Sequence, residues 1–161
     1  MKRKKKVSPI EVSLMLKRDL KDVVDIEKKS CSVEDEDFGI MIANYAWTSN
    51  KFISFIKKTN TYAYVIKEGE LIVGFFLLEV KDSEVLIERI CVDKNYRKSG
   101  FGKEILNFIY KKNYKNKVTH ICREDDVDAI KFFKCVGFTG KLMKNYFGDD
   151  IDGIRFNKEI S

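Results

Sequence analysis

The stretch LIERICVDKNYRKSGFGKEIL, residues 86–106, joins an apolar run to a second apolar pattern through a basic turn with two glycines. The first run is rich in β-branched residues up to Val92, which predicts a strand. The second pattern spaces four apolar side chains on one face of a helix: Phe101, Ile105, Phe108 and Ile109. The stretch therefore predicts a strand, a tight turn and a helix in direct succession.

The turn itself has the chemistry of an anion site. At the start of a helix the first backbone N–H groups lack partners, and the helix dipole adds partial positive charge. Gly100 and Gly102 would let that backbone approach a ligand closely, and Arg97, Lys98 and Lys103 add full charges. The turn therefore fits a pyrophosphate, although a plain structural turn fits the same residues. Its glycine spacing argues against an ATPase phosphate loop or a dinucleotide dehydrogenase.

Upstream of this stretch, we expect a strand, two helical segments and a hairpin. Alternating Val12, Leu14 and Leu16 indicate a strand. Asp19 is a predicted N-cap for a helix that carries Leu20, Val23 and Val24 on one face. Residues 32–58 are predicted to be mostly helical, with Phe38, Ile42, Trp47, Phe52 and Ile56 as their apolar positions. Residues 61–80 are two β-rich runs joined by a glycine turn, which predicts a β-hairpin.

Downstream, strands and helices alternate. A short strand is expected at 118–122, followed by a helix whose apolar positions are Val127, Ile130, Phe133 and Val136 and whose C′ residue is Gly137. Two strands, about 141–147 and 153–160, complete the chain. Strands that follow one another directly, and helices inserted singly between others, predict a mixed α/β domain.

Length and charge indicate one folded domain with a basic tail. The chain has 161 residues and a formal net charge of +6, of which five charges come from residues 2–6. We therefore expect a basic disordered tail at residues 1–8 and a single domain at 9–161. The nearly neutral remainder predicts no specific nucleic-acid partner. No apolar run is long enough for a membrane span or an export signal, so we expect a cytoplasmic protein without a membrane partner.

The cysteines and the lone histidine predict no metal site. Cys31, Cys91, Cys122 and Cys135 show no paired spacing, and His120 is the only histidine in the chain. Three of the cysteines lie within apolar segments, where a reduced thiol behaves as a small hydrophobic group. The pattern favours a reducing cytosol.

A second stretch completes a known pattern. REDDVDAIKFFKCVGF, residues 123–138, follows the glycine turn and ends in Gly-Phe. Together with the stretch at 86–106 it resembles the GNAT acyltransferase superfamily, whose acetyl-CoA motif is a strand followed by [RQ]xxGx[GA] and a helix. The resemblance covers roughly residues 12–160. It implies the GNAT fold, an α/β (α+β) fold with a mixed, mostly antiparallel sheet flanked by helices, and it implies acetyl-CoA (CoA) as the cofactor.

Within that superfamily, the chain is most similar to bacterial ribosomal-protein-alanine N-acetyltransferases. WTSNKF at 47–52 is similar to their Pro-Trp-Ser/Thr-x-x-x-Phe segment, with Ala46 in place of proline. KNYFGDDIDG at 144–153 is similar to their Asn-Tyr-Tyr…Asp-Ala ending. The resemblance implies that Trp47 and Tyr146 lie near an acceptor peptide, although core packing explains Trp47 equally well.

Residue by residue, the resemblance implies a cofactor site. The pantetheine arm would meet backbone groups of Ile90, Cys91 and Val92. The pyrophosphate would bind the turn formed by Arg97, Lys98, Ser99, Gly100, Phe101, Gly102 and Lys103. Asp126 occupies a position near the cofactor where these enzymes usually have Asn, and Phe132 and Phe133 would line the thiol end.

The usual acid and base of the family are both missing. Phe133 occupies the position of the family's tyrosine acid, and Ile121 occupies the strand position of its Glu or His. Glu88 and Tyr146 are the predicted catalytic residues, because a carboxylate can accept the proton of the amine and a phenol can donate one. A solvated or merely packed side chain explains each of them equally well, and Tyr146 could instead contact the substrate. Glu88 follows Leu86, the catalytic-Glu position of histone-type relatives, by two residues. His120 is a weaker candidate, because it should face away from Ile121.

The sequence thus predicts an N-acetyltransferase that moves an acetyl group from acetyl-CoA to a primary amine. The acceptor would be a protein N-terminus, for example of a ribosomal protein, or a lysine. Two alternatives remain open: a small amine such as a polyamine or an amino-sugar, and an acyl-CoA-binding domain without catalysis. Either a monomer or a homodimer is compatible with the sequence.

Overall fold

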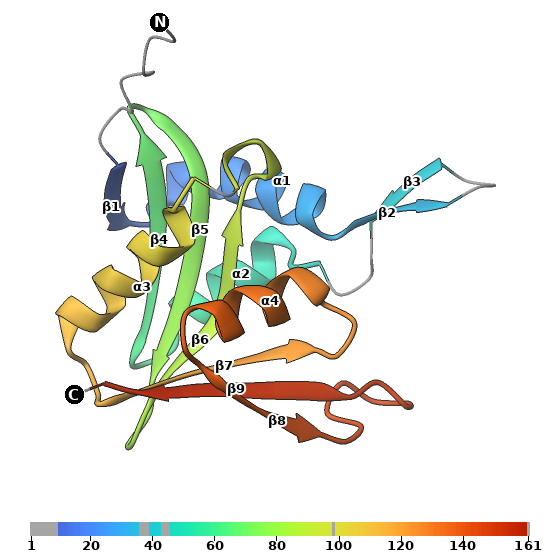
Figure 1. The fold of residues 1–161 in the computed structure, drawn as a ribbon. Helices are drawn as coiled ribbons and strands as arrows, with labels where there is room; N and C mark the ends of the chain where they lie inside the picture. The colour runs from blue at the N-terminus through green and yellow to red at the C-terminus, as the bar shows by residue number, and fades with distance from the viewer. Residues whose placement is uncertain (1–9, 36–38, 43–45, 98, 161) are drawn as a thin grey trace, which may run out of the picture.

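The structure is a computed structural model that describes residues 10–35, 39–42, 46–97 and 99–160. At its centre is a seven-stranded sheet in the order β1-β4-β5-β6-β7-β9-β8 (Figure 1). The strands of this sheet are β1 (Ile10–Leu14), β4 (Thr61–Glu68), β5 (Leu71–Val80), β6 (Val85–Val92), β7 (Lys117–Arg123), β8 (Thr139–Met143) and β9 (Gly153–Glu159). A separate hairpin consists of β2 (Ser32–Asp35) and β3 (Gly39–Ile42).

The sheet is antiparallel except between β6 and β7. These two strands run parallel and pair over only three residues, from Val85 opposite Val118 to Ile87 opposite His120. Beyond Ile87, β6 continues to Val92 without β7 beside it in the ladder. The sheet therefore opens between its fourth and fifth strands, at the end of β6 that leads into the glycine turn.

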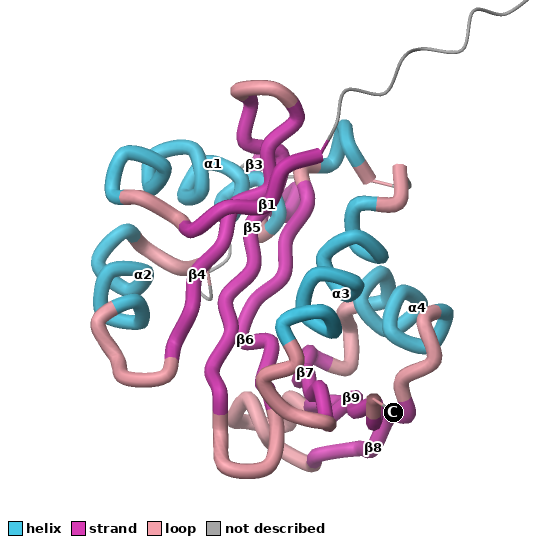
Figure 2. The backbone as a smooth tube through the Cα atoms, turned by 90° about the vertical axis from the view of Figure 1, so that its left-hand side faces the viewer, coloured by secondary structure: helices cyan, strands magenta, loops and turns pink. Residues whose placement is uncertain are grey.

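Two helices cover each face of the sheet (Figure 2). On one face lie α1 (Leu20–Ser30) and α2 (Ser49–Ile56), and on the other lie α3 (Phe101–Lys112) and α4 (Val127–Cys135). Short 3₁₀ turns at Lys17–Asp19 and Lys94–Tyr96 precede α1 and the glycine turn.

Each face has its own apolar cluster, because side chains alternate across every strand. Phe75 and Leu77 of β5 pack with Val23 of α1 and Phe52 of α2. Phe76 and Leu78 point the other way, toward α3 and α4, in a cluster with Ile105, Ile109, Phe133 and Phe156. The core is thus two layers separated by the sheet.

The predicted mixed α/β fold is confirmed, and so are the hairpin at 61–80, the strand before the glycine turn and the two helices after it. Asp19 precedes α1 as predicted, but its carboxylate accepts the backbone N–H of Leu16 instead of capping the helix. Gly137 follows the C-cap of α4 with φ of 91°, and its N–H donates to the Lys134 carbonyl.

The prediction that residues 32–58 are mostly helical is wrong. Among the described residues of this range only α2 is helical, and Ser32–Asp35 and Gly39–Ile42 form the β2–β3 hairpin, in which Val33 pairs with Met41 and Glu34 with Ile40. The apolar residues at 38 and 42 have helical spacing, but β-branched Val33, Ile40 and Ile42 favour extended backbone. Phe38, one of the predicted apolar positions, lies outside the described residues.

The end of the chain also differs in detail from its prediction. β8 begins at Thr139 and ends at Met143, so residues 144–147 belong to the turn that joins it to β9. Asn145 has φ of 54°, a left-handed conformation that ends a strand, and its N–H donates to the Asp152 carboxylate.

Candidate acetyl-CoA and acceptor site

The opening of the sheet begins at a β-bulge in β6. Leu77 of β5 pairs with Arg89, and the next residue, Leu78, pairs with Ile87. Glu88 is therefore the extra residue that no residue of β5 opposes. The bulge coincides with the last pair between β6 and β7, so the strand loses its regular pairing on both edges at nearly the same point.

After the bulge, Ile90, Cys91 and Val92 pair with β5 on one edge only. In the described residues, no strand occupies their other edge, so the backbone there is available to a ligand that lies along β6. One of these groups is already used, because the Val92 carbonyl accepts a hydrogen bond from Arg97 Nε at 2.9 Å.

The glycine turn leads into α3 without a capping side chain. Gly100 is the N-cap residue, has φ of 85°, and would have open space around a Cβ atom. The N–H groups that follow it at the helix start therefore face no side-chain acceptor, and they favour an anion. Ser99 and Lys103 are exposed beside this helix end. Lys98 lies outside the described residues.

Arg97 connects the turn to three neighbouring elements. Besides its bond to Val92, its Nη2 lies 3.4 Å from Ser30 Oγ at the end of α1. Its Nη1 lies 4.0 Å from a carboxylate oxygen of Asp128 in the first turn of α4. These contacts hold the guanidinium at the open end of β6.

Gly102 is explained by packing as well as by ligand approach. A Cβ atom at this position would lie 2.7 Å from the ring of Phe132, so a larger residue would displace α4 from α3. Phe132 therefore lies against the start of α3, beside the turn. Phe101, the neighbour of Gly102, is buried in the core on the same face of the sheet.

Phe133 and His120 form a stack inside the core. Phe133 has no exposed surface and lies parallel to the His120 ring at 4.6 Å between centroids. His120 Nδ1 lies 2.7 Å from the Ile87 carbonyl, and since that oxygen only accepts, Nδ1 carries the proton. Burial lowers the pKa of His120 despite this hydrogen bond. His120 thus faces α4, on the opposite side of β7 from Ile121, and Phe133 offers no surface to a ligand.

Asp126 caps α4. Its carboxylate accepts the backbone N–H of Ala129 at 3.1 Å, a role that Asp and Asn fill about equally well. The aspartate in place of the family's asparagine therefore has a structural explanation that does not involve the cofactor.

On the other face of the sheet, Glu88 and Trp47 line one cavity of about 230 Å³. Trp47 precedes α2 and is buried against Phe52 and Phe55. Glu88 is half-buried, and within the described part of the chain its carboxylate makes no hydrogen bond or ion pair. The structure thus brings a predicted catalytic carboxylate and the predicted acceptor-site tryptophan together.

Tyr146 lies in the turn that joins β8 to β9. A Cβ atom on Gly153 of β9 would lie 3.2 Å from Tyr146 Cβ and 3.4 Å from a methyl group of Ile121, which brings Tyr146 close to the position where relatives have their base. Half of the Tyr146 surface is exposed, and its ring packs edge-on against Phe147. It does not line the cavity that contains Glu88.

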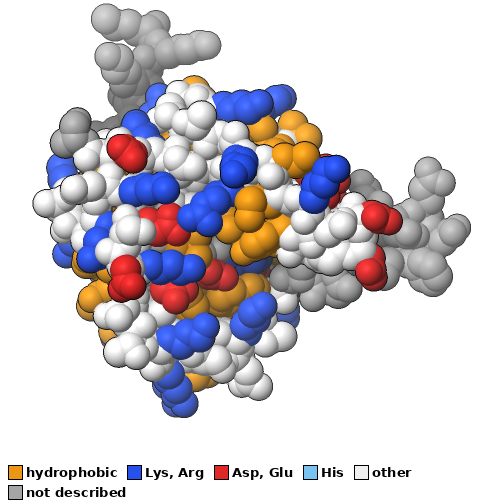
Figure 3. Space-filling model, turned by 90° about the horizontal axis from the view of Figure 1, so that it is seen from below, with side chains coloured by type: hydrophobic (Ala, Val, Ile, Leu, Met, Phe, Trp, Pro, Cys, Tyr) orange, Lys and Arg blue, Asp and Glu red, His pale blue; other side chains and the backbone are white. Residues whose placement is uncertain are grey.

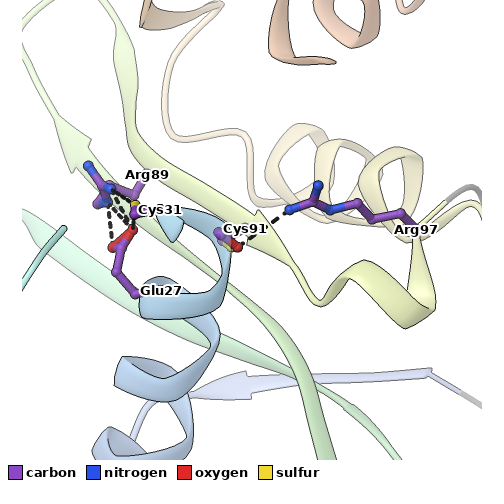
Figure 4. Close-up of polar contacts among 6 residues, drawn as sticks. Glu27, Cys31, Arg89, Cys91 and Arg97 are labelled. Carbon is purple, nitrogen blue, oxygen red and sulfur yellow. Dashed lines mark hydrogen bonds and ion pairs between the residues drawn. The ribbon is translucent and has the colours of Figure 1, made fainter. Parts of the chain in front are cut away.

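Sequence reasoning missed an ion pair between α1 and β6 (Figure 4). Glu27 of α1 is 2% exposed, and its carboxylate accepts hydrogen bonds from both Nε and Nη2 of Arg89 in β6, with Nε at 2.7 Å from Oε2. Burial opposes the charge of Arg89, but the bonds to Glu27 hold the pKa of Arg89 above its ordinary value. The Arg89 guanidinium also lies 5.2 Å from the Trp47 ring. The sequence did contain a signal for this pair. Glu27 is a charged residue at a buried position of α1, and Arg89 is a charged residue of opposite sign in an otherwise apolar strand.

Two cysteines complete this group of contacts. Cys31 Sγ lies 3.3 Å from Glu27, and Cys91 Sγ lies 2.7 Å from Ser30 Oγ. Burial and the Glu27 charge raise the pKa of Cys31 to about 12, and burial raises the pKa of Cys91 to about 11. Both side chains are therefore neutral thiols at neutral pH and poor nucleophiles.

Charge and composition of the described residues add three observations. On the face seen in Figure 3, basic and acidic side chains are interspersed and form no continuous basic patch. None of the described helices is long and apolar enough to cross a membrane. Within the same residues, no group of three or more His, Cys, Asp or Glu side chains could hold a metal ion.

Comparison with known proteins identifies the family. The family model for the acetyltransferase (GNAT) domain matches residues 59–140, and the chain belongs to the GNAT acetyltransferase family. Enzymes of this family use acetyl-CoA. The matched range contains β4 to α4, and therefore the bulge, the glycine turn and the helix that ends in Gly-Phe. No curated protein sequence matches the chain significantly.

Solved structures share the whole fold at low sequence identity. The ribosomal-protein-S18-alanine N-acetyltransferase of Escherichia coli has a TM-score of 0.72 at 18% identity, with 95% of each chain covered. A Bacillus anthracis protein solved in complex with acetyl coenzyme A has a TM-score of 0.71 at 18% identity, covering 94% of this chain and all of that one. A spermidine N-acetyltransferase variant from Vibrio cholerae has a TM-score of 0.70 at 11% identity, with 93% of each covered. These neighbours include proteins named for protein and for small-amine acceptors.

Proposed function

We propose that this chain transfers the acetyl group of acetyl-CoA to a primary amine, and that the amine is a protein N-terminus or a lysine. The observation that carries the proposal is the uncapped start of α3, placed directly after a strand that has lost its neighbour on one edge. That arrangement offers N–H groups to an anion and open backbone to an extended chain on the same ligand.

The residues present fit acetyl-CoA. The N–H groups after Gly100, together with Arg97 and Lys103, would hold its pyrophosphate, and the open edge of Ile90–Val92 would hold the pantetheine arm. Phe132 would flank the turn, where its ring already lies against Gly102. When bound, acetyl-CoA supplies an acetyl group that is activated as a thioester.

Glu88 is the residue that we assign to the amine. An amine must be neutral to attack, and an unpaired carboxylate at the open point of the sheet can orient its ammonium form and accept its proton, directly or through water. Trp47 forms the apolar wall beside it. Tyr146, near Ile121, is the candidate donor of a proton to the departing thiolate. Holding the amine next to the thioester contributes further rate acceleration.

A second candidate, a domain that binds acyl-CoA without catalysis, is favoured by one observation. The side chain at the family's tyrosine position, Phe133, has no proton to donate and no exposed surface. A small amine as the acceptor is the remaining alternative, because the cavity beside Glu88 is open to solvent.

Thermal unfolding with and without acetyl-CoA tests the cofactor site. A ligand at one hundred times its Kd stabilises a protein by about 2.7 kcal/mol, which corresponds to a rise in Tm of about 5–10 °C for a chain of this length. Gly100→Asp should remove this rise, because a carboxylate at the helix start repels the pyrophosphate.

Two variants control for the backbone. Gly100→Asn has nearly the same shape and the same tolerance of positive φ but no charge, so it should keep most of the rise. Gly69→Asp places the same carboxylate at another left-handed glycine, in the β4–β5 turn, where a Cβ atom also meets open space. No rise in the native chain, or a full rise in Gly100→Asp, would rule out the cofactor site.

Release of free thiol from acetyl-CoA tests catalysis. Peptides that begin with Ala or Ser should support turnover, and Glu88→Gln should lower kcat/KM by at least a hundred-fold, within the range typical of a general base. Binding of acetyl-CoA without turnover on peptides, lysine or small amines would favour the non-catalytic candidate. Turnover on polyamines alone would move the acceptor to the small-amine class.

A further inference from the structure

The cavity beside Glu88 is lined almost entirely by one side of α2 and its flanks. Besides Glu88 and Trp47, its lining residues are Lys51, Ser54, Phe55 and Lys58. Trp47 and Phe55 are buried and form the apolar floor, whereas the two lysines are exposed at its edge. The cavity therefore combines an aromatic floor, one carboxylate and two ammonium groups.

The charges in this cavity do not neutralise one another. Lys51 Nζ lies over the Trp47 ring at 4.7 Å from its centroid, and neither lysine forms an ion pair with any described residue. Glu88 is equally without an ion-pair partner among these residues. The other nearby cation, Arg89, is different, because Glu27 neutralises it from below. A ligand in the cavity would thus meet one negative group and two positive groups that are free to bind it.

The three charged groups of the cavity come from two parts of the fold. Glu88 lies at the bulge, where the sheet opens, and the lysines lie seven residues apart along α2 and its C-terminal end. At the rise of a helix, seven positions correspond to about 10 Å, which is about the length of three residues of extended chain; Lys58 itself follows the C-cap residue Lys57. Because Glu88 and both lysines line one cavity, an amine held at Glu88 would have its next few residues within the same cavity as Lys51 and Lys58.

We propose that this cavity binds the N-terminus of a peptide whose first residues after the α-amino group are acidic. The inference rests on the proposed function and adds the class of acceptor to it. Glu88 pairs with the ammonium group, and the lysines pair with carboxylates that follow it in the peptide. A polyamine has no group for the lysines, and its further ammonium groups are repelled by both of them.

Fluorescence of Trp47, the only tryptophan of the chain, gives a local readout of occupancy. The full chain, saturated with CoA, is titrated with Ala-Glu-Glu-Glu-Gly-Ser-Gly, with Ala-Lys-Lys-Lys-Gly-Ser-Gly and with spermidine. The acidic peptide should bind about ten-fold more tightly than the lysine peptide or spermidine, because two partly exposed ion pairs would produce a difference of this size. The difference should shrink at 0.5 M salt, where such pairs are screened.

A double variant identifies the groups responsible. Lys51→Glu with Lys58→Glu should abolish or reverse the preference for the acidic peptide. Lys57→Glu is the matched control, because Lys57 is exposed at the end of the same helix but does not line the cavity, and it should leave the preference in place. An α-N-acetylated acidic peptide should bind more weakly than the free peptide, because Glu88 then has no ammonium partner.

The inference and the proposed function fail in different ways. Equal binding of the three ligands, no Trp47 response to any of them, or a preference that survives the double variant would overturn the inference whatever the catalytic result. A chain that prefers acidic peptides in this titration but never releases thiol from acetyl-CoA would retain the inferred ligand class and lose the proposed transferase activity.

Discussion

The two halves of β6 carry similar side-chain chemistry and have different neighbours. Just before the first residue of the strand, Glu84 accepts hydrogen bonds from Thr119 of β7 and from Arg155 of β9, at 2.6 Å each at the closest. At the far half, Arg89 bonds instead to Glu27 of α1, on a helix above the sheet. The first network joins β6 to the strands beside it, whereas the second leaves that edge of β6 without a partner.

This difference shows how one strand can be both fixed and open. In the closed half, the ion pair of Glu84 with Arg155 and its hydrogen bond from Thr119 lie within the sheet and add to the ladder between β6 and β7. In the open half, contacts from α1 and from Arg97 hold β6 from the face and from the end, so its free edge can meet a ligand. We infer that the ion pair with Glu27 stabilises the open half of β6, as pairing with β7 stabilises the closed half. Three predictions test this comparison.

The largest effect is expected at Glu27. Glu27→Ala leaves Arg89 charged and only 24% exposed, without its partner, and breaking such a buried pair costs about 3–5 kcal/mol. We expect a fall in Tm of about 10 °C in thermal unfolding, and a weaker response to acetyl-CoA because the open half of β6 loses its support.

A double-mutant cycle with Arg89→Met shows whether the pair acts as a unit. If it does, the double variant should be more stable than Glu27→Ala, because no uncompensated buried charge remains. A loss below 1 kcal/mol for Glu27→Ala would show that the ion pair does not hold this half of the strand.

A smaller, pH-dependent effect is expected in the closed half. Burial alone would raise the pKa of Glu84, but hydrogen bonds from Thr119 and Arg155 outweigh it and hold the pKa below its ordinary value of 4.5. A depressed folded-state pKa contributes stability above pH 4.5 that is lost as the pH falls through the folded-state pKa. Urea unfolding of the native chain and of Glu84→Gln should therefore differ by about 2 kcal/mol at pH 7, and the difference should shrink as the pH falls from 4.5 through the folded-state pKa. A constant difference across that range would contradict the assignment.

The smallest effect is expected at His120, which lies at the boundary between the two halves, opposite Ile87. Its pKa is lowered by burial, so the neutral ring contributes stability above pH 6.5 that is lost as the pH falls below that value. As the only histidine, it gives a single imidazole C2–H signal in NMR, and the midpoint of its titration should lie below 6.5. A midpoint at or above 6.5 would mean that the stack on Phe133 opens to solvent.

Much of the fold could be predicted because local patterns and tertiary structure agree. The two β-rich runs at 61–80 specify a hairpin, and the helical spacing after Gly100 specifies a helix with one buried face. Residues 32–42 could not be predicted in the same way. Their apolar residues fit both periods, and the pairing of Val33 with Met41 is a contact between segments that no local pattern encodes.

In the candidate site, too, local features could be predicted from the sequence, whereas contacts between distant residues could not. The glycine turn is local, so its position at the start of α3 followed from the sequence, as did the candidacy of Glu88. The ion pair between Glu27 and Arg89 joins residues 62 positions apart, and Gly102 is required by Phe132, thirty positions away, so only the fold reveals either contact. Lys51 and Lys58 became candidate ligand-binding residues only when the fold showed that they line one cavity with Glu88.

The bulge at Glu88 has a further consequence for how this strand is constructed. Val85 and Ile87 face α3 and α4, as do Ile90 and Val92, while Arg89 and Cys91 face the opposite layer. If Glu88 were deleted, the remaining residues would alternate without interruption. The strand is therefore a complete structural unit with one supernumerary residue, and that residue carries the only charged side chain of β6 without an ion-pair partner among the described residues. A variant that lacks Glu88 should therefore keep the alternation of β6 and its packing while it loses the carboxylate that we assign to the amine.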